Sequence, residues 1–175
     1  MLKTMNIMKQ IRIEKLTLNI GAGKNPDVLK KGTKLLKNIT GLEPVKTVTQ
    51  KRIPDWGLRP GLPIGCKITL RKKPAYELVA RLLDAKSKKL KSNNFDENGN
   101  ISFGIHEYID IPGVKYDPEI GIIGFQACIT LERNGFRVKR RRLGRAALPK
   151  DHRIAKGEAI TYMASAFNVQ VGDEE

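Results

Sequence analysis

The stretch Leu16–Pro26, LTLNIGAGKNP, predicts a strand, a turn and the beginning of a helix. Apolar and polar residues alternate through its first half, which is the period of a strand with one buried face. Asn25 followed by Pro26 is typical of a helix start, because the Asn side chain caps free amide groups and Pro has no amide hydrogen to satisfy. The chain therefore has an early strand whose core side is formed by Leu16, Leu18 and Ile20.

The same periodicities continue along the chain. Strands are expected at residues 44–50, 64–71, 101–105 and 122–131, and further amphipathic helices are expected to begin at Pro74 and near Lys156. This order of strands and helices, with a hairpin in the middle, predicts an α+β fold. We expect a mainly antiparallel sheet with helices packed on one face and a long projecting hairpin loop. The predicted divisions are a flexible segment 1–10, a single domain 11–168 and an acidic tail 169–175.

If helices cover the apolar face of this sheet, its opposite face carries short hydrogen-bonding side chains and cations. Such groups can contact ribose hydroxyls, base edges and phosphates of RNA. A merely solvated face is the alternative, because Thr is common in strands. The residues expected on this face are Thr17, Asn19, Thr47, Thr49, Lys67, Thr69, Arg71, Gln126 and Thr130.

The charge of the chain favours a polyanionic partner. The formal net charge is +15 and the isoelectric point is about 10.0. Residues 133–156 alone hold ten basic groups and one acid, whereas residues 157–175 hold four acids and no Lys or Arg. We expect the densest basic run to bind phosphates, a disordered or targeting arm being the alternative. Its arginines are Arg140, Arg141, Arg142 and Arg145.

The loop QKRIPDWGLRPGLPIG, residues 50–65, combines three prolines, three glycines and the single tryptophan of the chain. The prolines restrict the unbound loop, so that less entropy is lost when it orders on a partner. Trp56 offers a surface on which a base can stack. The alternative is that Trp56 folds back as a hydrophobic plug.

Several functional classes find no support in the sequence. GAGK at residues 21–24 lacks the spacing of a P-loop, and the histidines and cysteines lack the spacing of a zinc site. We therefore predict no catalytic residues, no metal, no cofactor and no small-molecule substrate. No apolar run approaches the roughly 18 residues that a membrane helix needs, so no membrane partner is predicted. Cys66 and Cys128 lie in predicted strands, which favours reduced thiols and the cytoplasm.

The chain resembles the universal large-subunit ribosomal protein family that carries 5S rRNA, the "L five" family, in its archaeal and eukaryotic form. The resemblance is carried by LTLNIGAG, ITGLEPVKT, GLRPGLPIGCKITLR and FDENGNISFGIHEYIDIPGVKYDPEIGIIGFQ, and it spans about residues 11–168. The later segment NGFRVKRRRLGR, followed by LPKDHRI, is similar to the archaeal and eukaryotic version of the C-terminal part.

This resemblance implies a structural RNA-binding protein of the cytoplasmic ribosome and not an enzyme. It implies contacts with 5S rRNA, large-subunit rRNA and other proteins of the central protuberance. It also implies contacts with P-site tRNA and, through an intersubunit bridge, with a protein of the small-subunit head. By position, Asn19, Thr69 and Trp56 match family residues expected at 5S rRNA, and Arg52 and Arg59 match positions expected near tRNA or rRNA backbone.

The residues expected to bind rRNA are Asn19, Thr47, Trp56, Lys67, Thr69, Arg71, Arg140, Arg141, Arg142 and Arg145, and those expected to bind tRNA are Arg52 and Arg59. Leu42 stands where the family often has Gln, so no side-chain hydrogen bond is transferred to that position. A non-ribosomal RNA chaperone or assembly factor is the alternative function, and an enzyme acting on a phosphate substrate is a third.

Overall fold

The computed structural model describes residues 6–172 of the 175-residue chain. Residues 1–5 of the predicted flexible segment and residues 173–175 of the predicted acidic tail lie outside the described part. A five-stranded antiparallel sheet in the order β2-β3-β1-β6-β5 forms the centre of the molecule. Its strands are β1 (Ile11–Gly21), β2 (Val45–Val48), β3 (Pro63–Leu70), β5 (Asn100–Ile105) and β6 (Phe125–Arg133).

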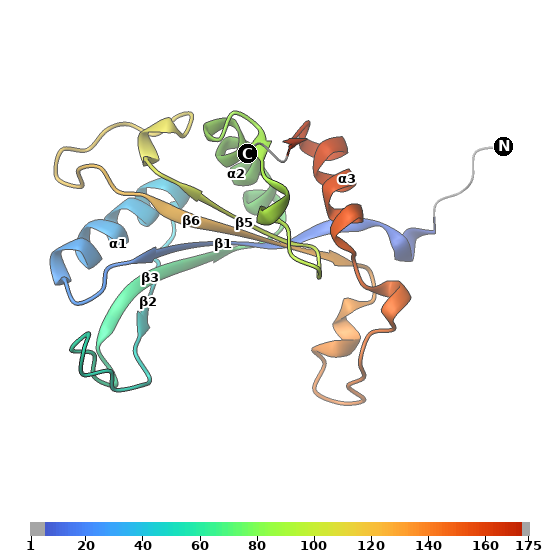
Figure 1. Ribbon diagram of the computed structural model, residues 1–175, viewed down its shortest axis with the longest axis horizontal. Coiled ribbons are helices and arrows are strands. Elements are labelled where there is room, and N and C mark those ends of the chain that lie inside the picture. Colours follow the sequence, from blue (N-terminus) through green and yellow to red (C-terminus); the bar gives the residue numbers. More distant parts are fainter. Residues whose placement is uncertain (1–5, 173–175) are drawn as a thin grey trace.

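Three helices cover one face of this sheet, which confirms the predicted α+β fold class. They are α1 (Pro26–Thr40), α2 (Lys72–Ala85) and α3 (Lys156–Phe167). In Figure 1 the sheet is seen almost edge-on, with α1 and α2 above it and α3 beside α2 near one end. The rings of Tyr76 in α2 and Phe167 in α3 lie 4.7 Å apart, so the helices pack on each other as well as on the sheet.

The first helix forms as its sequence predicts. The side chain of Asn25 accepts a hydrogen bond from the amide of Asp27, Pro26 occupies the first turn, and Gly41 ends the helix in the left-handed conformation. Gly32 faces the sheet, where a Cβ atom would lie 3.1 Å from the Ile20 side chain. The absence of a side chain at Gly32 therefore lets α1 lie close against β1.

Other elements differ from the sequence prediction at their ends. The second helix begins at Lys72 and not at Pro74. Pro74 is tolerated in the first turn, since the amide that proline lacks would have no partner inside the helix. The last long strand begins at Phe125 and not at residue 122. Thr49, predicted on the polar face, is buried, and its hydroxyl donates to the carbonyl of Leu62.

Two short strands were not predicted. β4 (Lys89–Leu90) and β7 (Gln170–Val171) pair in parallel, and Val169 just before β7 is buried. Regular structure thus continues past residue 168, where the sequence analysis placed the end of the domain. At the other end, Ile7–Lys9 form a turn of 3₁₀-helix within the segment predicted to be flexible.

We expect the substitution Gly65→Ala to destabilise the protein by about 1–3 kcal/mol, because it overpacks the sheet. A Cβ atom at this position in β3 would lie 2.6 Å from the backbone oxygen of Ile20. Gly104→Ala in β5 is the matched control, since a Cβ atom there meets nothing within 4 Å. Urea denaturation of both variants measures the difference, and equal stabilities would show that β3 can move away from β1 at no cost.

Candidate nucleic-acid interface

The face of the sheet opposite the helices is lined by polar side chains that the strand register brings into rows. Asn19 lies opposite Lys67 of β3 and Gln126 of β6, and Thr17 lies opposite Thr69 and Cys128. Because directly opposite residues point to the same side of a sheet, these residues form one continuous polar surface. None of them belongs to the buried core. We call this surface the open face, and it includes Thr47, which lies opposite Gly65.

One end of the open face is hollowed beside Asn19. The hollow has a volume of about 360 Å³, and the neighbouring amide side chain of Gln126 also lines it. The glycines Gly21 and Gly124 leave room there. Gln126 is predicted on this face but is not among the predicted RNA-binding residues. Only the β1–β6 register shows that its amide stands next to that of Asn19.

The connection from β2 to β3, residues 49–62, is folded on itself. Ile53 and Leu58 form a two-residue bridge with paired backbone hydrogen bonds, and Leu58 is buried. Trp56 at the turn is 65% exposed, so the predicted alternative of a hydrophobic plug is wrong. Arg52 and Arg59 are also exposed. Figure 1 shows this connection below one end of the sheet, and its predicted long projection stays a prediction.

A second appendage, residues 136–153, lies below the other end of the sheet in Figure 1. We call it the basic arm. Its base is anchored: Phe136 is buried, the His152 ring lies 5.7 Å from the Phe136 ring, and Nε2 of His152 lies 2.9 Å from the backbone oxygen of Asn134. The outer part, residues 139–147, is exposed throughout. The predicted basic run therefore lies in an exposed loop that is anchored at its base.

Three arginines of the basic arm surround one hollow of about 600 Å³. It is lined by Arg137, Arg141, Arg142 and Leu143, the last of which is 82% exposed. The amide of Arg141 donates to the carbonyl of Arg137, and this helical turn brings the two side chains to the same side. Arg137 was missed as a site residue, although its spacing of four residues from Arg141 could have indicated it. Arg145, which also belongs to the basic arm, is exposed.

Two of the predicted rRNA-binding arginines make ion pairs within the protein. Arg140 contacts the carboxylates of both Glu14 and Glu132, and Nη1 of Arg71 lies 3.5 Å from Glu14. The side chains of Arg71 and Arg140 are still 54% and 43% exposed. Their predicted contact with phosphate stays a prediction, but each already has a partner in the free protein.

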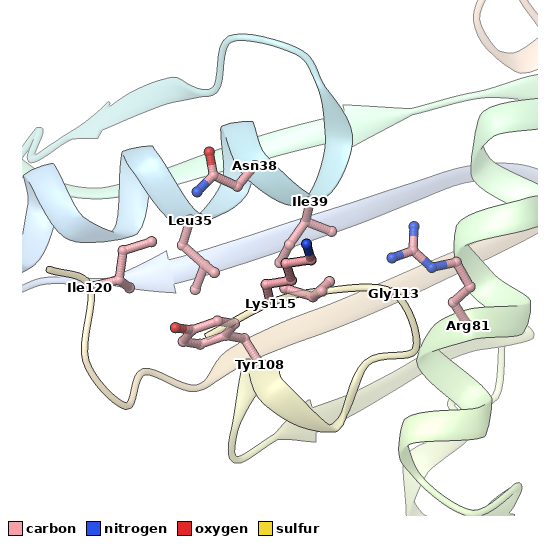
Figure 2. Close-up of a pocket in the computed structure, with 9 residues that line it drawn as sticks. Leu35, Asn38, Ile39, Arg81, Tyr108, Gly113, Lys115 and Ile120 are labelled. Carbon is pink, nitrogen blue, oxygen red and sulfur yellow. The ribbon is translucent and has the colours of Figure 1, made fainter. Parts of the chain in front are cut away.

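The helix side of the sheet offers a different kind of cavity. A hollow of about 310 Å³ lies between α1 and the connection 106–124, where Figure 2 shows Leu35 and Ile39 facing Tyr108 and Ile120. Lys115 and Arg81 also line it, and Figure 2 shows Arg81 reaching toward it from α2. The lining contains no carboxylate, histidine or thiol.

Features of two other functional classes are absent from residues 6–172. No helix in this range is both long and apolar enough to cross a membrane. The same range contains no group of three or more His, Cys, Asp or Glu side chains placed to hold a metal ion.

Comparison with known protein families gives matches over almost the whole described part of the chain. Residues 6–59 match the family model of ribosomal protein L5, and residues 63–162 match the model of the C-terminus of the same ribosomal family. The chain belongs to the ribosomal protein L5 family. Because this family is a structural component of the ribosome, the chain is not an enzyme.

Relatives within the ribosomal protein L5 family are archaeal and match over nearly their full length. The large ribosomal subunit protein uL5 of Sulfurisphaera tokodaii is 47% identical over 170 residues, which cover 97% of this chain and 96% of that protein. The protein of the same name from Nanoarchaeum equitans is 49% identical over 165 residues, 94% of this chain and 97% of that one. The protein of the same name from Methanococcus maripaludis is 44% identical over 167 residues, which cover 94% of this chain and 92% of that protein. The predicted archaeal-type family is thus confirmed.

We expect Trp56→Ala to leave the melting temperature nearly unchanged, because the side chain is mostly exposed in the free protein. Leu58→Ala two residues away should destabilise the protein by about 2–3 kcal/mol, because it removes a buried side chain. Thermal melts of the two variants make the comparison. A large drop in the melting temperature for Trp56→Ala would show that the tryptophan packs on the fold in solution.

The ion pair between Lys34 of α1 and Asp117 predicts a pH-dependent attachment of the connection 106–124. The Lys34 Nζ atom lies 2.8 Å from the Asp117 carboxylate and also contacts Glu119. Hydrogen bonding to Lys34 lowers the pKa of Asp117, and hydrogen bonding to Asp117 raises the pKa of Lys34. The pair therefore stabilises the fold above the ordinary carboxylate pKa and below the ordinary lysine pKa.

We expect Asp117→Asn to lower the melting temperature at neutral pH. The difference from wild type should disappear as the pH falls through the lowered pKa of Asp117, where the wild-type carboxyl is also neutral. Glu77→Gln is the control, because Glu77 is exposed and makes no ion pair within the described residues. A difference that persists at the acid end would contradict the role of the charge.

Proposed function

We propose that the chain is a structural constituent of the large ribosomal subunit, that it binds 5S rRNA and that it helps to attach this RNA in the central protuberance. The names of the archaeal relatives support the ribosomal part of the proposal. The observation that carries the RNA part is the open face, a continuous polar surface between two cationic appendages. Asn19, Lys67 and Thr69 lie in this surface at positions fixed by the strand register.

The groups on the open face and on the basic arm suit different parts of an RNA. The amides and hydroxyls of Asn19, Gln126, Thr47 and Thr69 can donate to and accept from ribose and base edges. Lys67, Arg71 and arginines of the basic arm such as Arg141 and Arg142 supply charge for phosphates, including large-subunit rRNA next to the 5S rRNA. The exposed ring of Trp56 offers a stacking surface.

The connection 49–62 is proposed to meet P-site tRNA through Arg52 and Arg59. Both side chains are exposed at the end of the molecule away from the basic arm, so the two appendages can contact different RNAs at once. We further propose contacts with other proteins of the central protuberance and, by an intersubunit bridge, with a protein of the small-subunit head. This function places the protein in the cytoplasmic ribosome.

Asn19→Ala and Thr69→Ala test the open face. Each should weaken binding to 5S rRNA by roughly 1–3 kcal/mol, which is the cost of leaving a buried donor or acceptor of the RNA without a hydrogen bond. Asn38→Ala is the matched control, because Asn38 is an exposed amide on α1, on the helix side of the sheet. Binding is measured by salt titration against 5S rRNA and an unrelated structured RNA. Equal affinity of the wild-type protein for both RNAs would overturn the proposed specificity.

Alkylation of the two cysteines provides a second test, which uses the wild-type protein. Cys128 is half-buried on the open face, whereas Cys66 is fully buried under α1, where burial raises the pKa of its thiol. We expect 5S rRNA to slow alkylation of Cys128 strongly. Cys66 reports on unfolding and should stay unmodified throughout. Unchanged alkylation of Cys128 in the complex would exclude the open face as the RNA-binding surface.

A further inference from the structure

Two carboxylates stand at the edge of the open face, where a surface that binds RNA would be expected to avoid negative charge. Glu14 lies in β1 and Glu132 lies in β6, and each side chain is only 9% exposed. A carboxylate so nearly buried needs partners, because losing its hydration is costly. All the partners that the structure gives to these carboxylates are arginines, and one of these arginines comes from the basic arm.

Arg140 joins the two carboxylates. Its Nη1 atom donates to Oε1 of Glu14, and its Nη2 atom donates to Oε2 of Glu132 at 2.6 Å. Arg12 binds the other oxygen of Glu132, Oε1, with its Nε atom at 2.9 Å and its Nη2 atom at 2.8 Å. Arg71 approaches Glu14 from the end of β3 at 3.5 Å. The planar fork of Arg140 therefore connects the basic arm to two strands at once.

The sheet itself holds the carboxylates in place. Glu132 lies directly opposite Arg12 in the β1–β6 register. Glu14 is the extra residue where this register shifts between Ile13 and Lys15. Such a bulge bends a strand and re-aims a side chain. Glu132 is thus held by the ladder itself, and Glu14 by its place between the paired residues Ile13 and Lys15, so neither position depends on the arm.

The outer part of the basic arm depends on few contacts. Residues 139–147 are exposed, and within the described chain Arg140 is their one side chain with an ion pair to the sheet. The remaining contacts are internal to the arm: the amide of Ala146 donates to Val138, and Nε of Arg141 donates to Gly144. Loss of the Arg140 contacts would leave the arm attached at its base, through Phe136, Leu148 and His152.

We propose that Glu14 and Glu132 are positioning residues that dock the basic arm on the sheet through Arg140 before RNA binds. Arg140 is then the anchor of the arm, and Arg141 and Arg142, which line the hollow beside it, carry the phosphate contacts. This inference rests on the proposed RNA-binding function and gives each arginine a separate role. Docking in advance favours binding, because less freedom of the arm is lost in the complex.

The positioning role and simple charge repulsion predict opposite signs for the removal of a carboxylate. If Glu132 only repels phosphates, Glu132→Gln should tighten RNA binding. If it docks the arm, the same substitution should weaken binding to 5S rRNA roughly tenfold, the equivalent of one charge-assisted hydrogen bond. Glu14→Gln should act in the same direction, and thermal melts confirm that both variants are folded.

The salt dependence of binding separates the anchor from the phosphate contacts. Arg142→Gln should flatten the slope of log K against log salt by about 0.7–0.9, because one phosphate contact is lost. Arg140→Gln should lower the affinity at every salt concentration and leave the slope unchanged. The double variant Glu132→Gln, Arg140→Gln should be no weaker than Arg140→Gln alone, since both changes break the same contact.

Amide hydrogen exchange of the free protein tests the docking without RNA. Residues 138–148 should exchange faster in Glu132→Gln and Arg140→Gln and at the wild-type rate in Arg142→Gln. Unchanged exchange in all three variants, or tighter 5S rRNA binding by Glu132→Gln, would overturn the inference. A slope that falls as much for Arg140→Gln as for Arg142→Gln would do the same. Failure of the proposed function is distinct, because it appears as equal wild-type affinity for 5S rRNA and unrelated RNA.

Discussion

Hydrogen bonding of β1 along both of its edges, to β3 and to β6, is the constraint on which the rest of the molecule depends. A strand in that position cannot slip without breaking two ladders, and a slip by one residue would turn every side chain to the wrong face. Leu16, Leu18 and Ile20 are therefore held in the core under the helices. Thr17 and Asn19, between them, are held on the open face by the same backbone.

This single register serves stability and function together. The apolar residues of β1 pack beneath α1 and α2, so the hydrophobic effect holds the sheet against the helices. The polar residues on the other side lose little further freedom when a ligand arrives, because the strands already set their spacing. A rigid polar surface suits a folded RNA, whose ribose and phosphate groups are themselves fixed in space.

The sheet also determines where the basic side chains of the protein are presented. A large part of the surplus of basic groups lies in the basic arm, where long side chains remain exposed. Near the basic arm, carboxylates of the sheet hold Arg140, and the neighbouring Arg142 is exposed. Negative groups close to an RNA-binding surface can thus serve to order the positive ones. Net charge alone describes attraction to RNA, whereas these ion pairs determine where the charge is presented.

The long strands and helices, and the two sides of β1, could be predicted from the sequence, because local chemistry fixes them. Asn25, Pro26 and Gly41 mark the ends of α1, and the period of two in β1 separates core from surface. The dense basic run and the resemblance of several stretches indicated an RNA-binding protein of the ribosomal family. These signals lie within a few residues of one another, so they need no knowledge of the fold. Tertiary structure alone decided which distant residues meet: the pairing of Asn19 with Gln126 joins segments far apart in the chain.

The short strands β4 and β7 and the exposure of Trp56 likewise depend on contacts that no local pattern contains. The role of Arg140 is the clearest case, since its sequence neighbours are also arginines. Only the register of β1 and β6, with its bulge at Glu14, places two carboxylates within reach of that one guanidinium.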